Sequence, residues 1–236
     1  MALPKISHPT FELTLPSTKQ KIKFRPFLVK EEKILLMAMQ GEDPEEIVNS
    51  IKQVINNCIL SEAIDIDNLS TFDLEYLFVK IRAKSVNNIV KLSYRDLEDE
   101  KKYDFEVNLD EVEIQFNPSH TNKVEIAKNL GFYLRYPSAS MSSKIGDVDN
   151  ETDLFFDILK LCIDRVYEGE NEFSARDASE EELDEFMQNL DVKSFKKIQE
   201  FFSTMPKLYH EIKYTNSLGN ERVIKLNSLS DFFTLG

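Results

Sequence analysis

The chain has 236 residues, 42% of them hydrophobic, and it contains 17 Phe and 8 Tyr. This supply of apolar side chains is enough for one large core or two small ones, and it excludes a disordered acidic tail. The formal net charge of -13 at pH 7 argues against a nucleic-acid-binding protein, because affinity for phosphates depends on Lys and Arg.

The sequence lacks the features of secreted and membrane proteins. Its first residues, MALPKISHPTFEL, have neither the charged nor the apolar region of a signal peptide. No window reaches the roughly 18 apolar residues that span a bilayer. Cys58 and Cys162 lie in apolar helical patterns and are expected to pack as small hydrophobic side chains, which fits a reducing cytoplasm. We therefore expect a soluble intracellular protein with no nucleic-acid partner and no membrane partner.

The first predicted elements are a strand hairpin and a helix, joined by a corner at Pro26. Residues 11–15 and 21–25 alternate apolar with polar side chains, the period of two expected of half-buried strands, around the polar turn PSTKQ. Pro26 ends the second strand because proline cannot donate to a sheet. Residues 29–39 then form a helical run without Gly or Pro.

Two more helices are predicted before the next strands. Pro44 suits the first turn of a helix, and apolar residues recur at helical spacing from there to about residue 60. From Leu74 onward, apolar residues stand at i, i+3, i+4 and i+7 behind Ser70 and Asp73, which are spaced as in a capping box.

The middle of the chain predicts antiparallel strands. Residues 89–94 and 103–107 form a hairpin around the charged turn 96–101, whose tip we expect in water, and residues 124–137 contain a second strand pair. Residues 138–150 are small and polar, which favours a linker or mobile loop.

Three further helices and a hairpin are predicted near the end of the chain. Apolar stripes run over residues 155–166, 183–190 and 195–205; the second opens on the capping box Ser179 to Glu182, and the third stops at Pro206. Residues 208–233 read as strand, polar turn, strand and then a short helical or turn segment, an order similar to the strand, turn, strand and helix of residues 11–36, which indicates a recurrent module.

This order of elements predicts an α+β fold in which antiparallel β-hairpins combine with about six amphipathic helices. Two similar subdomains are expected, residues 1–137 with a hairpin, three helices and antiparallel strands, and residues 138–236 with a loop, three helices and the C-terminal hairpin. Packing of both into one domain is the alternative.

Catalytic and cofactor signatures are missing from the sequence. It holds no P-loop, no G-x-G-x-x-G, no H-E-x-x-H, no G-x-S-x-G and no Cys-x-x-Cys. His210 alternates with Leu208 and Ile212 as a sheet residue does. We therefore expect no catalytic residue, no metal and no cofactor.

Two acidic runs are the remaining candidates for chemistry. Residues 147–153 carry a carboxylate at every second position, but Thr152 and Ile158 stand where an EF-hand loop needs Gly and Glu. Residues 180–185 lie in the first turns of a capped helix, where acidic side chains favour the helix dipole. Both runs are better explained as charged helix starts. A metal-dependent or acid-base enzyme stays an outside alternative.

Aromatic side chains gather at corners and breaks of the predicted fold. Most of them must be core residues, but an exposed minority would anchor another protein. We therefore favour a binding or structural module over an enzyme, and we predict that the corner of Arg25, Pro26 and Phe27 docks a partner.

The opening MALPKISHPTFELTLPSTKQKIKFRPFLVKEEKILLMA, with its LPST turn and its RPFLVKEEK corner, resembles the family of baseplate hub subunits and hub assembly proteins of T-even-type contractile-tailed bacteriophages (myoviruses). The later stretches FSARDASEEELDEFMQNL, IQEFFSTMPKLYHEIKY and the terminal DFF are similar to the same family. The resemblance therefore covers nearly the whole chain.

The resemblance implies a non-enzymatic phage tail protein that acts in assembly of the central hub of the baseplate through contacts with other hub proteins. It implies a location in the cytoplasm of the infected bacterium, with the virion tail baseplate as a second location. A permanent structural subunit is the alternative to a transient assembly chaperone, because high negative charge suits a reversible partner but does not exclude a permanent one. A homo-oligomer is left open.

Overall fold

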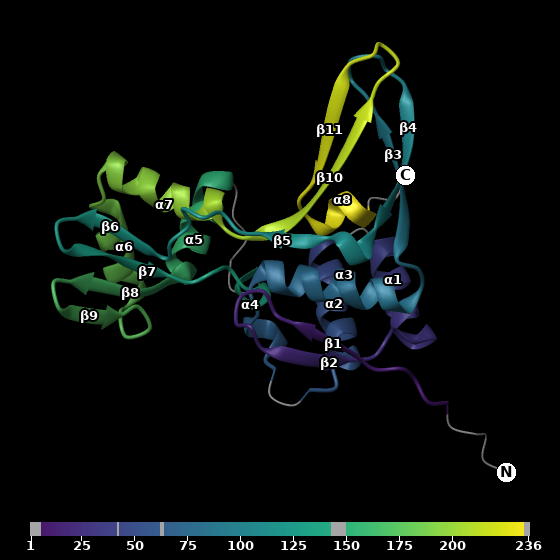
Figure 1. Cartoon of the computed structure of the whole chain (residues 1–236). Coiled ribbons are helices and arrows are strands. Elements are labelled where there is room, and N and C mark those ends of the chain that lie inside the picture. The colour runs from purple at the N-terminus through teal and green to yellow at the C-terminus, as the bar shows by residue number, and fades with distance from the viewer. Residues whose placement is uncertain (1–5, 42, 62–63, 143–149, 234–236) are drawn as a thin grey trace. The chain divides into compact units, whose positions relative to one another are not determined.

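The computed structural model of the chain describes residues 6–41, 43–61, 64–142 and 150–233. Over these residues the fold is α+β, with antiparallel hairpins and helices as the sequence predicts (Figure 1). The chain forms two compact units: unit 1 comprises Met1–Gln115 and Lys207–Gly236, and unit 2 comprises Phe116–Pro206.

Unit 1 contains three antiparallel groups of strands, β1–β2, β3–β4 and β11–β10–β5. Its elements are β1 (Phe11–Thr14), β2 (Lys21–Phe24), α1 (Val29–Gly41), α2 (Pro44–Cys58), η1 (Ile66–Asn68), α3 (Thr71–Ser85), β3 (Ile89–Arg95), β4 (Lys102–Asn108), η2 (Leu109–Glu111), β5 (Glu113–Gln115), β10 (Lys207–Thr215), β11 (Glu221–Leu226) and α8 (Leu229–Phe233).

Unit 2 contains one four-stranded antiparallel sheet of order β6–β7–β8–β9 with its helices. Its elements are β6 (Lys123–Ala127), β7 (Leu130–Leu134), α4 (Ala139–Ser142), α5 (Glu151–Cys162), β8 (Ile163–Glu168), β9 (Asn171–Ser174), α6 (Glu180–Gln188) and α7 (Val192–Thr204).

The six predicted helices all form, as α1, α2, α3, α5, α6 and α7. Asp43 caps α2 and leaves the proline at the first helical position, and Ser70 caps α3. Nearly every residue from Phe72 to Ala83 of α3 is buried, so this helix is the core of unit 1. The short helix α8 forms where a short helical or turn segment is predicted after the C-terminal hairpin. The short helix α4 is additional and lies in the predicted linker; residues 143–149 of that linker lie outside the described residues.

Most of the turn at the tip of the β3–β4 hairpin is in water, as predicted, with Leu97 83% exposed and Glu98 and Glu100 exposed, but Asp96 at its start is buried. Asp96 is fully buried, because the hydroxyl of Tyr214 donates to its carboxylate and Arg222 pairs with it at 3.3 Å. Glu98 accepts hydrogen bonds from the side chains of Asn216 (2.7 Å) and Asn220 (2.6 Å). The tips of the β3–β4 and β10–β11 hairpins are therefore joined to each other, as Figure 1 shows at their turns.

The division into two units differs from the boundary after residue 137 that the sequence suggested. β10 pairs with β5 through Leu208 opposite Ile114, so the last part of the chain belongs to unit 1. A pairing between strands so far apart in sequence leaves no local pattern from which a boundary can be read.

The predicted helical stripe over residues 155–166 is wrong at its end. α5 ends at Cys162, and Val166 lies in β8, opposite Phe132 of β7. β8 continues into β9 through a turn at Gly169, whose φ of +61° favours glycine. The β8–β9 hairpin was not predicted, because apolar spacings of three and four also fit residues 155–166.

A corner of the same design occurs once in each unit. In unit 1, the residue after β2 is Arg25, whose N–H donates to the carbonyl of Cys58 at 2.9 Å, at the end of α2. In unit 2, the residue after β7 is Arg135, whose N–H donates to the carbonyl of Cys162 at 2.8 Å, at the end of α5. Both cysteines are free and fully buried, as predicted.

Candidate functional site: a groove between three helices

A groove in unit 2 is formed by α5, by α6 and by the start of α7. Each helix begins on a side chain that caps it: Asn150 for α5, Ser179 with Glu182 in a full capping box for α6, and Asp191 for α7. The caps define the residue at which each helix begins. Three residues, Asn189, Leu190 and Asp191, separate α6 from α7.

The helices rest on an apolar core that they share with the sheet. The fully or nearly buried members of this core are Val124, Phe132, Leu134, Leu159, Ile163, Met187, Ile198 and Phe201. Met187 belongs to this core and also lines the groove, so the floor of the groove is continuous with the core. A floor of this kind is held in place by packing.

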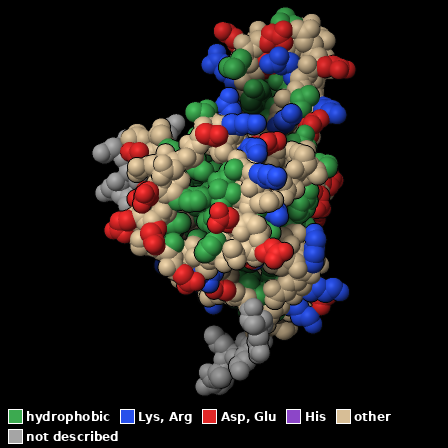
Figure 2. Space-filling view, turned by 90° about the vertical axis from the view of Figure 1, so that its left-hand side faces the viewer, with side chains coloured by type: hydrophobic (Ala, Val, Ile, Leu, Met, Phe, Trp, Pro, Cys, Tyr) green, Lys and Arg blue, Asp and Glu red, His purple; other side chains and the backbone are tan. Residues whose placement is uncertain are grey.

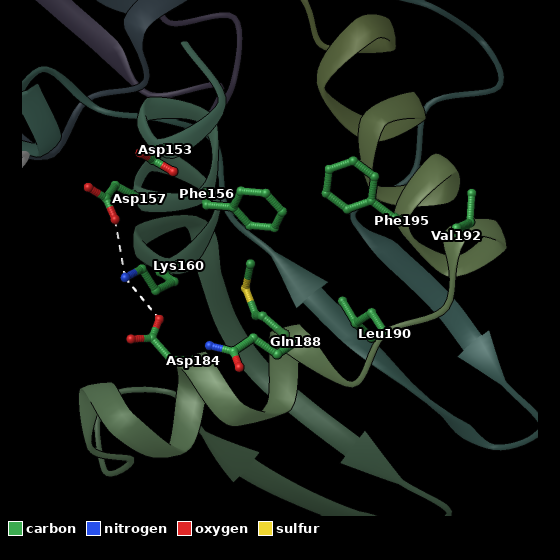
Figure 3. Close-up of a pocket in the computed structure, with 10 residues that line it drawn as sticks. Asp153, Phe156, Asp157, Lys160, Asp184, Gln188, Leu190, Val192 and Phe195 are labelled. Carbon is green, nitrogen blue, oxygen red and sulfur yellow. Dashed lines mark ion pairs between the residues drawn. The ribbon is translucent and has the colours of Figure 1, made fainter. Parts of the chain in front are cut away.

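The groove has a volume of about 540 Å³. Its lining residues are Asp153, Phe156, Asp157, Lys160, Asp184, Met187, Gln188, Leu190, Val192 and Phe195. The rings of Phe156 and Phe195 are stacked with centroids 5.3 Å apart, and Figure 3 shows them facing each other between the helices. Val192 is 74% exposed at the start of α7, an unusual fraction for a large apolar side chain beside a groove.

One side of the groove is charged. Lys160 of α5 pairs with Asp157 at 3.1 Å and with Asp184 of α6 at 3.0 Å (Figure 3). The hydrogen bonds from Lys160 to Asp184 and Asp157 outweigh burial and raise the pKa of Lys160, so it stays an ammonium at neutral pH. The lining nevertheless holds three carboxylates, including Asp153, and one ammonium.

The surface around unit 2 has a similar distribution of side chains. Figure 2 views the molecule from the side on which β6 to β9 lie in Figure 1, and it shows hydrophobic side chains gathered in one area with Asp and Glu along much of the border. An apolar area with a charged border is typical of a protein-binding surface.

The groove has the features of a binding site. It combines an apolar floor, two stacked rings and a few charged groups at its rim, the features expected of a site that takes an apolar side chain. Among the residues that the structure describes, no group of three or more His, Cys, Asp or Glu is placed to hold a metal ion. The lining includes no histidine.

The predicted docking corner at Arg25 is engaged inside unit 1. The Arg25 guanidinium pairs with the fully buried carboxylate of Glu31 at 3.0 Å and donates to the carbonyl of Asn57 at 2.8 Å. Phe27 is 8% exposed and packs on Phe78, with ring centroids 5.9 Å apart, while Pro26 is half-buried. Docking at this corner stays a prediction, and little of the Phe27 ring is left for a partner to contact.

The other candidate residues do not meet in one place. His210 lies in β10 opposite Leu226, in the sheet as predicted. Of the carboxylates over residues 147–153, those at positions 147, 149 and 151 lie outside the described side chains, so a calcium site there stays untested. Residues 180–185 form the start of α6 behind its capping box, as the helix interpretation predicted.

Sequence reasoning missed the groove, although part of its signal was present. Asp153, Phe156, Asp157 and Lys160 stand at i, i+3, i+4 and i+7, so they share one face of a helix. That face is mixed, with one aromatic among charged residues, and nothing local shows that it meets Asp184 and Phe195.

A family model described as T4 bacteriophage base plate protein matches residues 8–234. The chain belongs to this family. A comparison of the base plate protein with curated proteins and one with solved structures each gave no match.

Membership confirms the phage and baseplate part of the resemblance. It gives the base plate protein a structural or assembly role in a phage tail baseplate, in contact with other baseplate proteins. None of the described helices is long and apolar enough to cross a membrane.

Proposed function

We propose that this base plate protein acts, without catalysis, in assembly of the central hub of the phage baseplate, and that it binds a hub protein through the groove between α5, α6 and α7. The observation that carries the proposal is the groove itself, an apolar hollow with a charged rim in a chain of the T4 bacteriophage base plate protein family.

The size of the groove favours a reversible contact. The groove has a volume of about 540 Å³, which is the size of a small-molecule site and holds only a few side chains of a partner. Burying one such side chain stabilises a complex by about 1.5–3 kcal/mol, whereas association itself costs at least about 4 kcal/mol. The groove therefore supports specific but weak binding, which suits an assembly factor that is later released.

A permanent subunit of the baseplate is the second candidate, and α1 carries the observation that favours it. Val29, Leu36 and Met37 of α1 are 88%, 53% and 61% exposed, and their spacing of seven and eight residues puts them on one face of the helix. Such a face would give unit 1 an apolar contact surface of its own, of the kind that a permanent interface uses.

Deletion of the gene tests the hub role. In cells infected with the deleted phage, we expect tail parts outside the hub to accumulate while complete baseplates fail to form, and the wild-type gene supplied in trans should restore them. Complete baseplates of normal composition in the deleted phage would show that the proposal is wrong.

Quantitative mass spectrometry of purified particles then separates the two roles. Absence from mature particles, with abundance in infected cells, is the result expected of an assembly factor. A stoichiometric amount of the protein in the particles would show that it is a permanent subunit and not an assembly factor.

A further inference from the structure

We propose that the groove between α5, α6 and α7 binds a segment of another baseplate protein that inserts an apolar side chain beside Phe156 and Phe195 and places a Lys or Arg against Asp157 and Asp184. This inference rests on the proposed function, which supplies the class of partner. It adds the chemistry by which the partner is recognised.

The apolar part of the segment follows from what the groove leaves uncovered. Val192 is 74% exposed at the lip, and the stacked pair of Phe156 and Phe195 lies next to it in the lining. An inserted Leu, Met or Phe would cover these three side chains together, so a single anchor removes most of the apolar exposure.

The basic part of the segment follows from the charges of α5 and α6. Lys160 is shared by Asp157 and Asp184, and Asp153 adds a third carboxylate to the lining. On α6, Glu180 and Glu181 stand four and three residues before Asp184, so they extend the acidic wall on the same helix face. One ammonium for this many carboxylates leaves a place for a second cation.

The third wall is uncharged and sets the direction of the segment. α7 contributes only Val192 and Phe195 to the lining, and the exposed Lys196 stands four residues after Val192, on the same side of the helix. A segment with its cation toward α5 and α6 therefore meets attraction, and the reversed segment would put that cation on the apolar wall of α7, on the side of Lys196. Charge thus selects orientation as well as partner.

A second copy of this chain fits the groove less well than a basic partner. The chain has a formal net charge of -13, so two copies repel each other as they approach. Self-association is therefore an alternative outcome of the test.

Synthetic peptides of about 15 residues that tile the other baseplate proteins of the same phage are the probes, with peptides that tile this chain as a second set. Binding to the full chain is measured by fluorescence anisotropy. We expect the binding peptides to share an apolar residue within one helical turn of a Lys or Arg. Val192→Ser and Asp184→Lys should each raise their Kd about tenfold.

Matched controls stand outside the groove. Phe173→Ser removes an apolar side chain that is 54% exposed on β9, and Glu170→Lys makes the same charge change at the β8–β9 turn. Both should leave Kd unchanged. Replacing the peptide's Lys by Glu should weaken binding to the wild-type chain about tenfold and restore binding to Asp184→Lys, a reciprocity that a merely unfolded variant would not show.

Three outcomes would overturn the inference. If baseplate peptides bind with a Kd that neither groove variant changes, the contact lies outside the groove, and the proposed hub role is unaffected. Peptides of this chain could bind the groove in preference, which would make a second copy the occupant. If none of the baseplate peptides binds, the inference is wrong, and the evidence for the hub role then comes from the gene deletion alone.

Discussion

The two corners at Arg25 and Arg135 have the same backbone design and different side-chain partners. Each Arg follows a strand and donates its N–H to the carbonyl of a buried Cys at a helix end. Arg25 also forms an ion pair with buried Glu31, whereas Arg135 donates its Nε–H to the carbonyl of Leu161 at 2.8 Å and has no ion-pair partner among the described residues.

The difference shows which part of the corner is essential to the design. A cation beside the last carbonyls of a helix satisfies groups that the helix itself leaves unpaired, and both units use it. The buried carboxylate of Glu31 is an addition of unit 1. It makes Arg25 necessary there, because a buried carboxylate without its partner is costly.

The largest expected effect comes from Arg25→Ala. This change leaves the Glu31 carboxylate buried without its guanidinium, and we expect unit 1 to lose about 3 kcal/mol of stability. Burial raises the pKa of Cys58 to about 11, so its thiol reacts only when the corner opens. Labelling of Cys58 by a thiol reagent, read by peptide mass spectrometry, should therefore accelerate about a hundredfold.

Arg135→Ala is the matched change in unit 2. It removes a hydrogen bond to a backbone carbonyl and leaves no buried charge, so we expect about 1 kcal/mol and about fivefold faster labelling of Cys162. If Arg25→Ala accelerates the labelling of Cys58 only as much as Arg135→Ala accelerates the labelling of Cys162, the comparison is contradicted. That result would mean that the ion pair with Glu31 adds no stability specific to unit 1.

A smaller difference is expected between Cys162→Ser and Cys58→Ser. The thiol of Cys162 contacts the sulfur of Met141 at 3.9 Å, so a hydroxyl there meets an apolar neighbour and should cost about 2 kcal/mol. The Cys58 sulfur lies 3.7 Å from a guanidinium nitrogen of Arg25, which can donate to a hydroxyl and reduce the cost by about 1 kcal/mol.

Urea unfolding of the two serine variants measures this difference directly. Equal costs would mean that Arg25 is too firmly held by Glu31 and Asn57 to turn toward the new hydroxyl. A larger cost at Cys58 would show that the comparison of the two surroundings is wrong.

The smallest effect is a pH dependence confined to unit 1. Burial raises the pKa of Glu31, but the hydrogen bonds from Arg25 and from the N–H of Leu28 outweigh it and hold the pKa below its ordinary value of 4.5. A depressed pKa stabilises the fold above the unfolded value, and this contribution is lost as the pH falls through the folded pKa.

The stability difference between the wild-type chain and Glu31→Gln is therefore expected to be constant above about pH 5 and to shrink as the pH falls below it. In unit 2 the difference between the wild-type chain and Arg135→Gln should stay flat over the same range. A difference for Glu31→Gln that does not change with pH would show that the pKa of Glu31 is the same in the folded and unfolded chains, and a difference that grows as the pH falls would show that its folded pKa is raised.

The sequence by itself determined most of the local elements and the family. Period-two alternation predicted β1 and β2, helical spacing predicted six helices, and capping residues such as Ser179 predicted where helices begin. These signals work because they depend on residues a few positions apart. The groove residues of α5 could be assigned to one helix face from the sequence, because they too lie only three or four positions apart.

Tertiary structure decided the rest, because the deciding contacts join residues far apart in sequence. β8 is a strand rather than the end of α5 because β7 offers it a partner, and Asp96 is buried within an otherwise exposed turn because Tyr214 and Arg222 reach it. The groove exists because Asp184 and Phe195 come to face α5. The periodicity of the sequence does not predict contacts between residues that are far apart along the chain. These contacts form because whole helices and strands pack on a shared core.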